Sequence, residues 1–180
     1  MKLILLDRDG VLAEEVPNYV KHPGELKLIP GAAAALARLN RAGWRVAVCT
    51  NQSVVGRGII PSAMLERIHE HLRDGLAREG GRIDAIFACT DPPWAATERR
   101  KPGAGMLREA LSRFSAEPAA TPMVGDSLGD MQAALKAGCP RVLLRTGHGA
   151  RTQAAGLPPE LAPVAVHADL AAYVAHLLGP

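Results

Sequence analysis

Short apolar runs alternate along the chain with longer segments in which apolar residues recur every three or four positions. The short runs are rich in Val, Ile and Leu and are bounded by Gly, Pro or polar residues, a pattern that favours buried strands. The longer segments have the period of amphipathic helices, and Pro or Gly stands at many of their ends. This alternation predicts an α/β fold.

We expect strands at residues 3–6, 45–49, 85–89, 122–124, 142–144 and 164–166. We expect helices at residues 31–42, 61–78, 103–112, 128–137 and 169–178. Strands separated by helices form parallel sheets through right-handed crossovers. The predicted fold is a Rossmann-like, doubly wound, mainly parallel sheet with helices on both faces, and no linker or repeat divides residues 1–180 into more than one domain.

Composition and charge exclude several classes of function. Lys and Arg total 21 and Asp and Glu total 18, but the two signs are interspersed, so no basic stripe for nucleic acid is expected. Aromatic residues make up only 3% of the chain, too few for a platform that stacks bases. No apolar run is long enough to span a membrane, and the three cysteines lie far apart, which is typical of free thiols. We expect a cytoplasmic monomer without membrane or nucleic-acid partners.

Two acidic residues, Asp7 and Asp9, end the first apolar run, and Gly10 follows them. Residues two apart in a strand point the same way, so both carboxylates should leave the strand near each other. The carboxyl edge of an α/β sheet is where ligands bind. Like charges this close repel unless a cation lies between them, which indicates a divalent metal and a reactive carboxylate.

Further polar groups follow other predicted strands or begin helices. Residues 50–53 read Thr-Asn-Gln-Ser, residues 99–103 read Arg-Arg-Lys-Pro-Gly, and residues 125–130 read Gly-Asp-Ser-Leu-Gly-Asp. Each of these alone is a common turn sequence. Their order along the chain is the stronger signal: an acid pair, a hydroxyl, a lysine and a second acid pair.

This ordered set resembles the haloacid dehalogenase superfamily, and more narrowly its D,D-heptose 1,7-bisphosphate phosphatase and histidinol-phosphatase family. The similarity runs over roughly residues 2–148. It implies a capless haloacid dehalogenase-type core and a phosphatase that works through an aspartyl phosphate. With no cap, a flap at residues 13–27 and a loop at residues 90–100 would exclude bulk water.

The resemblance also implies roles for the motif residues. Asp7 would be the nucleophile, and Asp9 would protonate the departing oxygen and later take a proton from water. Mg²⁺ would be held by Asp7, the Asp9 backbone carbonyl, Asp126 and waters. The other expected catalytic groups are Thr50, a donor to the phosphoryl oxygens, and Lys101, which balances their charge and orients Asp7. Asn51 would bind the substrate as a second donor to these oxygens, and Asp130 would support Lys101 or a metal-bound water.

The substrate implied by the resemblance is D-glycero-D-manno-heptose 1,7-bisphosphate, a precursor of lipopolysaccharide heptose, cleaved at its 7-phosphate. Arg100 would face the second phosphate, and Arg57 would face the part that does not react. The sugar would be lined by Gln52, Ser53, Asn18 and Tyr19. The Arg8 side chain would point away from Asp7 and Asp9.

One departure from the family concerns zinc. Well-known members carry a structural zinc on a Cys-x-His pair and a Cys-x-Cys pair before the lysine. Here those positions hold Cys89, Asp91, Thr97 and Arg99, and one thiolate cannot make a closed tetrahedral site. We therefore expect no zinc, with Trp94 and neighbouring prolines ordering the loop.

Several alternatives stay open. The enzymatic ones are a histidinol-phosphate phosphatase or another small phosphomonoester phosphatase, with a nucleic-acid 3′-phosphatase less favoured because no basic stripe is present. The non-enzymatic one is a receiver-type signalling domain, which also groups acids, Thr or Ser and Lys at strand ends. Among the histidines, His69 and His71 are expected on a solvated helix surface and His148 in an ordinary loop.

Overall fold

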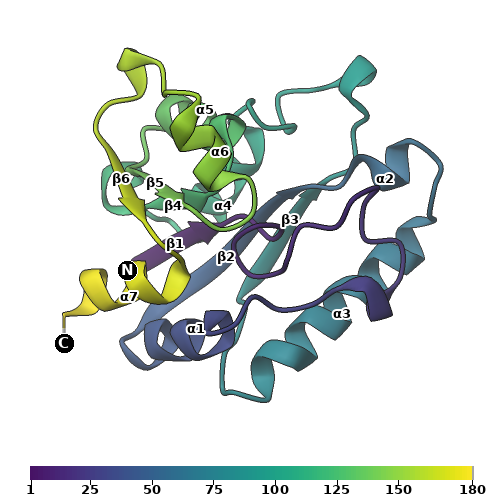
Figure 1. Cartoon of the computed structure of the whole chain (residues 1–180), viewed down its shortest axis with the longest axis horizontal. Coiled ribbons are helices and arrows are strands. Elements are labelled where there is room, and N and C mark those ends of the chain that lie inside the picture. Colours follow the sequence, from purple (N-terminus) through teal and green to yellow (C-terminus); the bar gives the residue numbers. More distant parts are fainter. Residues whose placement is uncertain (180) are drawn as a thin grey trace.

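The computed structural model describes residues 1–179, and its centre is one six-stranded parallel sheet (Figure 1). The strand order is β3-β2-β1-β4-β5-β6. The strands are β1 (Lys2–Leu6), β2 (Trp44–Asn51), β3 (Ala85–Cys89), β4 (Met123–Gly125), β5 (Arg141–Leu144) and β6 (Val164–His167). Every neighbouring pair is parallel, so the predicted doubly wound sheet is confirmed.

Helices cover both faces of the sheet (Figure 1). One face packs against α1 (Ala32–Arg41), α3 (Ser62–Ala77) and α7 (Leu170–Leu178), and the other packs against α4 (Gly105–Arg113) and α5 (Leu128–Ala137). The side chains of β1 contribute to the core on both faces of the sheet. Ile4 and Leu6 belong to the first cluster and Leu3 and Leu5 to the second, because successive strand residues point to opposite faces.

Two short helices were not among the predicted elements: α2 (Ser53–Gly56) directly after β2, and α6 (Gly149–Ala154) after β5. Both are too short to carry a helical period in the sequence. The 3₁₀ turns η1 (Pro23–Glu25), η2 (Pro93–Ala95), η3 (Pro118–Ala120) and η4 (Pro159–Leu161) fall in the connecting segments.

The expected position of His69 is wrong. Its side chain is buried, whereas His71 is exposed as predicted. The buried stripe of α3 includes Leu65 and Leu72, and His69 lies one turn after Leu65 on that same face. The helix therefore turns one histidine inward and the other outward.

The register around β1 brings the acid-rich segments together. Leu6 pairs with Val48 of β2 on one side and with Val124 of β4 on the other. Asp7, Thr50 and Asp126 therefore leave three adjacent strands at the same edge. The strand order reverses at β1, which is where doubly wound sheets form their ligand crevices.

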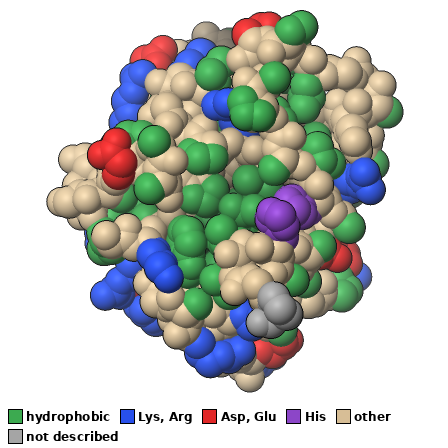
Figure 2. All heavy atoms as spheres, turned by 90° about the vertical axis from the view of Figure 1, so that its left-hand side faces the viewer, with side chains coloured by type: hydrophobic (Ala, Val, Ile, Leu, Met, Phe, Trp, Pro, Cys, Tyr) green, Lys and Arg blue, Asp and Glu red, His purple; other side chains and the backbone are tan. Residues whose placement is uncertain are grey.

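The flap and the 90–100 loop lie at that carboxyl edge, whereas both termini lie at the other side of the molecule (Figure 1). Figure 2 shows this other side, where hydrophobic side chains gather in the middle of the view. A hollow of about 510 Å³ lies between β5, β6 and α7 and is lined mainly by apolar groups such as Val142 and Leu177. No helix within residues 1–179 is both long and apolar enough to cross a membrane.

Candidate active site

A hollow of about 330 Å³ opens at the carboxyl edge, over the end of β1. The residues around it, nearly all polar or charged, come from every segment that the sequence singled out. They are Asp7, Asp9, Glu15, Tyr19, Asn51, Arg100, Lys101, Asp126, Ser127, Gly129, Asp130 and His148. This convergence of acids around one lysine makes the hollow, rather than the larger apolar one, the candidate active site.

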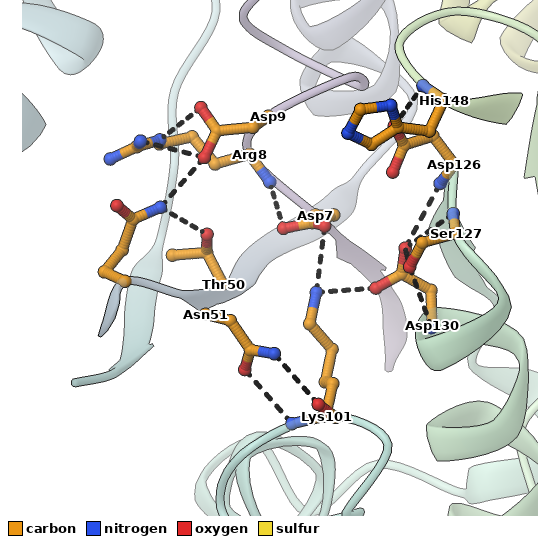
Figure 3. Close-up of polar contacts among 11 residues, drawn as sticks. Asp7, Arg8, Asp9, Thr50, Asn51, Lys101, Asp126, Ser127, Asp130 and His148 are labelled. Carbon is orange, nitrogen blue, oxygen red and sulfur yellow. Dashed lines mark hydrogen bonds and ion pairs between the residues drawn. The ribbon is translucent and has the colours of Figure 1, made fainter. Parts of the chain in front are cut away.

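Asp7 lies at the centre of the group (Figure 3). Its Oδ1 accepts a hydrogen bond from the Arg8 backbone N–H at 2.7 Å, and its Oδ2 lies 3.0 Å from the ammonium nitrogen of Lys101. Burial raises the pKa of Asp7 to about 7, against the opposing effect of Lys101. The raised pKa reflects a carboxylate held among other acids in a place with little water.

Lys101 is buried between two carboxylates. Its Nζ lies 3.0 Å from Asp7 Oδ2 and 2.6 Å from Asp130 Oδ1. Burial alone would lower the pKa of the Lys101 ammonium group, but Asp130 and then Asp7 outweigh it and raise that pKa. Lys101 therefore carries a fixed positive charge beside Asp7.

Asp130 is fixed by the start of α5. Ser127 is the N-cap of this helix, and its hydroxyl and backbone N–H donate to Asp130 Oδ2 at 2.7 and 3.0 Å. The reciprocal bond from the Asp130 backbone N–H to Ser127 Oγ completes a capping box. The other oxygen of Asp130 contacts Lys101, which is one of the two positions expected for this residue.

Asp126 follows β4 and faces Asp7 across the hollow. Its Oδ2 accepts the backbone N–H of His148 at 2.7 Å. Burial, and next the charge of Asp7, raise the pKa of Asp126 to about 8. Gly10 and Gly147 lie so close to the Asp126 carboxylate that a Cβ atom on either glycine would overlap Asp126 Oδ2. The backbone is thus shaped to let this carboxylate enter the site.

These carboxylates fit a divalent cation. Oxygen atoms of Asp7, Asp126 and Asp130 lie within 4.8 Å of one another. Asp130 already contacts Lys101 with one oxygen and Ser127 with the other, so Asp7 and Asp126 are the better placed ligands. Hard carboxylate oxygens in small number are the donor set that Mg²⁺ favours.

The structure corrects the expected direction of Arg8. Its guanidinium turns toward Asp9, with Nε 3.0 Å from Asp9 Oδ1 and Nη2 2.8 Å from Oδ2 (Figure 3). The alternation of a strand places neighbours on opposite sides, but β1 ends at Leu6 and the chain then turns at Gly10, where φ is +79°. Alternation therefore does not apply to these two residues.

Thr50 and Asn51 end β2 beneath the hollow. Thr50 Oγ1 accepts a hydrogen bond from Gln52 Nε2 at 2.9 Å, which leaves the Thr50 hydroxyl proton free to donate. Asn51 lines the hollow, and its amide also binds the Lys101 backbone through both its nitrogen and its oxygen. Asn51 therefore has a structural contact that the sequence did not indicate.

The other expected sugar contacts divide into two groups. Tyr19 and Arg100 line the hollow, and Gln52 lines a narrow recess of about 50 Å³ beside Asp9. Asn18, Ser53 and Arg57 line neither space.

Arg57 instead joins the flap and the 90–100 loop by side-chain stacking. Its guanidinium carbon lies 5.7 Å from the ring centre of Tyr19 in the flap and 5.0 Å from that of Trp94 in the 90–100 loop. Its Nε donates to Ser53 Oγ at 3.2 Å. Tyr19, Arg57 and Trp94 thus form a stack beside the hollow, and of these three only Tyr19 lines it.

The loop at residues 90–100 is ordered by hydrogen bonds as well as by its prolines. Asp91 Oδ2 accepts from the backbone N–H and the hydroxyl of Thr97 at 2.9 and 2.5 Å. Arg100 donates to the Asp91 carbonyl at 2.9 Å, which holds its guanidinium group at the edge of the hollow.

Two lining residues were missed by the sequence reasoning. Glu15 lies in the flap, and His148 lies after β5 with its Nε2 3.6 Å from Glu15 Oε2. His148 follows Gly147 shortly after the end of β5. The rule that site residues follow the carboxyl ends of strands, which predicted Asp7 and Asp126, could have predicted His148 too. Glu15 has no comparable signal, because it lies within the irregular flap and not at the end of a strand.

A parallel sheet that places a buried lysine and facing aspartates at its carboxyl edge defines the haloacid dehalogenase-like hydrolases. A family model described as HAD-hydrolase-like matches residues 98–173. The D-glycero-β-D-manno-heptose-1,7-bisphosphate 7-phosphatase of Bordetella bronchiseptica is 45% identical over 178 residues, which cover 99% of this chain and 98% of that protein. The enzyme of the same name from Pseudomonas putida is 42% identical over 178 residues, which cover 99% of this chain and 100% of that protein. The chain belongs to this family of heptose-bisphosphate phosphatases.

Solved structures agree. The D,D-heptose 1,7-bisphosphate phosphatase from B. bronchiseptica, complexed with magnesium and phosphate, superposes with a TM-score of 0.94, covering 99% of this chain and 98% of that one at 45% identity. The enzyme from Burkholderia thailandensis gives a TM-score of 0.77 at 40% identity, covering 100% of both chains. The expected superfamily, fold and enzyme class are confirmed.

Proposed function

We propose that this chain is a Mg²⁺-dependent phosphatase that removes the 7-phosphate of D-glycero-β-D-manno-heptose 1,7-bisphosphate. The observation that carries the proposal is the placement of Asp7 between the Lys101 ammonium group and Asp126 at the base of the hollow. The names of the similar proteins support the substrate.

Asp7 is the proposed nucleophile. Its carboxylate oxygen forms a bond to phosphorus as the bond from phosphorus to the sugar oxygen breaks, and Asp9 gives that oxygen a proton. Water then attacks the phosphorus of the aspartyl phosphate and gives a proton to Asp9. This step releases phosphate and restores the Asp7 carboxylate.

The fixed charges around Asp7 act on the transferred group. Lys101 keeps its positive charge beside Asp7 and balances the charge of the phosphoryl oxygens, and the Thr50 hydroxyl has a proton to donate to one of them. Asp7, Asp126 and the Asp9 backbone carbonyl would hold Mg²⁺. When bound, the cation polarises the phosphoryl group and relieves the repulsion between the acids.

Arg100 is the proposed contact for the phosphate that does not react. It lines the hollow, where the Asp91 carbonyl holds its guanidinium group, and a guanidinium group binds phosphate through paired hydrogen bonds. Tyr19 lines the same hollow and supports a role beside the sugar.

Turnover of a phosphate-ester panel tests the proposal. We expect Mg²⁺-dependent hydrolysis of the heptose bisphosphate to exceed that of histidinol phosphate, and Asp7→Asn to abolish it. A preference for histidinol phosphate would overturn the substrate. Phosphoaspartate that accumulates without turnover would indicate a receiver domain instead.

A matched pair of variants tests the second phosphate. Arg100→Gln should raise KM for the bisphosphate by roughly tenfold or more, since a hydrogen bond to a charged group contributes about 1.5–3 kcal/mol. Arg99→Gln is the control, because Arg99 pairs with Glu109 on the surface. An equal response of bisphosphate and monophosphate substrates to Arg100→Gln would contradict this role.

We also propose that residues 1–180 form one phosphatase domain without a separate cap. The flap supports this, because Val20 and Leu26 are buried in the main core and Ala13 bridges to Leu28. The monomeric state, the cytoplasmic location and the absence of zinc stay predictions.

A further inference from the structure

Arg8 carries a permanent charge where almost no water reaches it. Its side chain is 1% exposed, and Asp9 is the only acidic group within ion-pair distance of it among residues 1–179. A buried charge is stable only if it is paired and hydrogen bonded, so the guanidinium group and the Asp9 carboxylate hold each other in place.

The contact is a paired one. Arg8 Nε and Nη2 reach the two oxygens of Asp9 at 3.0 and 2.8 Å, which fixes the plane of the carboxylate as well as its position. Gln52 Nε2 donates to Asp9 Oδ2 at 2.9 Å and also to Thr50 Oγ1. Asp9 Oδ2 thus accepts two hydrogen bonds and Oδ1 only one, so Oδ1 is the oxygen with more lone-pair capacity left for a further contact.

We propose that Arg8 is a positioning residue, which aims the Asp9 carboxyl at the leaving oxygen and stabilises the carboxylate left after proton transfer. This inference rests on the proposed function, because it assumes that Asp9 manages the protons of phosphate-ester hydrolysis. Arg8 itself touches no reacting atom and acts through Asp9.

The reactivity of the leaving group provides a test that a merely structural role would not pass. A sugar alkoxide is a poor leaving group and needs a proton, whereas p-nitrophenolate leaves without one. The heptose bisphosphate and p-nitrophenyl phosphate are therefore compared on the full chain with Mg²⁺. Arg8→Met should lower kcat on the order of 10²-fold for the sugar phosphate, within the range of general acid catalysis, and far less for the aryl phosphate.

Two further variants define the pattern. Asp9→Asn should show the same selective loss in stronger form, and Arg8→Lys, which keeps the charge but not the paired geometry, should recover part of the activity on the sugar phosphate. Arg141→Met is the control, because the Arg141 side chain makes two partly buried hydrogen bonds, to the Leu161 and Cys139 carbonyls, but does not line the site. It should affect both substrates equally or not at all.

The outcomes separate the two proposals. If the unmodified chain hydrolyses neither ester, the proposed function fails. If it hydrolyses both and Arg8→Met lowers both by the same factor, the role of Arg8 is overturned while the function stands. Should Arg8→Met not fold, Arg8→Lys carries the same comparison. In that case a double variant, Arg8→Lys with Asp9→Asn, is compared with Asp9→Asn alone. The two should have the same kcat for the sugar phosphate. A lower kcat in the double variant would show that Arg8 does not act through Asp9.

Discussion

The side-chain amide of Asn51 makes two hydrogen bonds to the backbone of Lys101. Its Nδ2 donates to the Lys101 carbonyl at 2.9 Å, and its Oδ1 accepts the Lys101 N–H at 3.0 Å (Figure 3). These two bonds join the end of β2 to the segment before α4. They fix the base of the lysine side chain, as Asp7 and Asp130 fix its tip.

Asn51→Ala should therefore reduce kcat more than it changes KM. A shift of about 1 Å in a catalytic group can cost on the order of 10²-fold in rate. Asn40→Ala is a matched control, because Asn40 binds the backbone N–H and carbonyl of Arg82 in the same way, away from the site. Asn51→Ala should lose about 1–3 kcal/mol of stability, because it leaves partly buried backbone groups unsatisfied, and Asn40→Ala should lose less, because its bonds are exposed. Only Asn51→Ala should lose activity. Equal activity in the two would contradict the assignment.

Gly147→Ala should weaken Mg²⁺ binding. The new methyl group would overlap Asp126 Oδ2 and force this carboxylate to move. The Mg²⁺ concentration for half-maximal activity should rise about 10- to 100-fold, as for other groups that orient metal ligands. Gly156→Ala is the control for backbone strain. Gly156 also has a positive φ, of +83°, but nothing lies within 4 Å of its Cβ position. An unchanged Mg²⁺ requirement in Gly147→Ala would show that Asp126 is not a ligand.

His69 should make the stability of the chain depend on acid. Burial, and next the charge of Arg8, lower its pKa in the folded chain from the ordinary 6.5 to about 3. Between these values the unfolded chain binds the extra proton, so the stabilising effect of neutral His69 is complete above about pH 6.5 and is lost as pH falls toward 3.

Denaturant titration from pH 7 to pH 4 measures this effect. His69→Gln should reduce the slope of unfolding free energy against pH by up to about 1.4 kcal/mol per pH unit. His71→Gln is the control, because His71 is exposed, and this variant should keep the slope of the unmodified chain. Identical slopes in all three proteins would mean that folding does not lower the pKa of His69.

Chelation should remove activity without loosening the 90–100 loop. Asp91 and Thr97 hold this loop through hydrogen bonds. After treatment with EDTA, Mg²⁺ alone should restore full activity, and protease cleavage near Trp94 should not increase. Stoichiometric zinc in protein purified without added metal would refute the expected absence of a zinc site.

The sequence reveals those site residues whose role follows from their place at the end of an element. Asp7, Thr50 and Asp126 could be predicted because each lies at, or directly after, the carboxyl end of a strand of the same parallel sheet. The helix-start rule likewise revealed Lys101.

Contacts that depend on side-chain direction could not be predicted in this way. The Arg8 contact with Asp9 forms where the chain has already left β1, and the Asn51 contact with Lys101 joins segments 50 residues apart. His69 shows the same limit, since a polar residue beside an apolar stripe can face either way until packing decides.

The stack of Tyr19, Arg57 and Trp94 differs in kind from the contacts beneath it. An exposed cation–π contact contributes only about 0.5–1 kcal/mol, whereas Lys101 and Asp130 form a buried ion pair. Replacing a residue of the exposed stack should therefore cost the fold little, whereas removing one partner of the buried pair leaves an uncompensated charge. The side chains beside the hollow are thus freer to change in sequence than the charges beneath it.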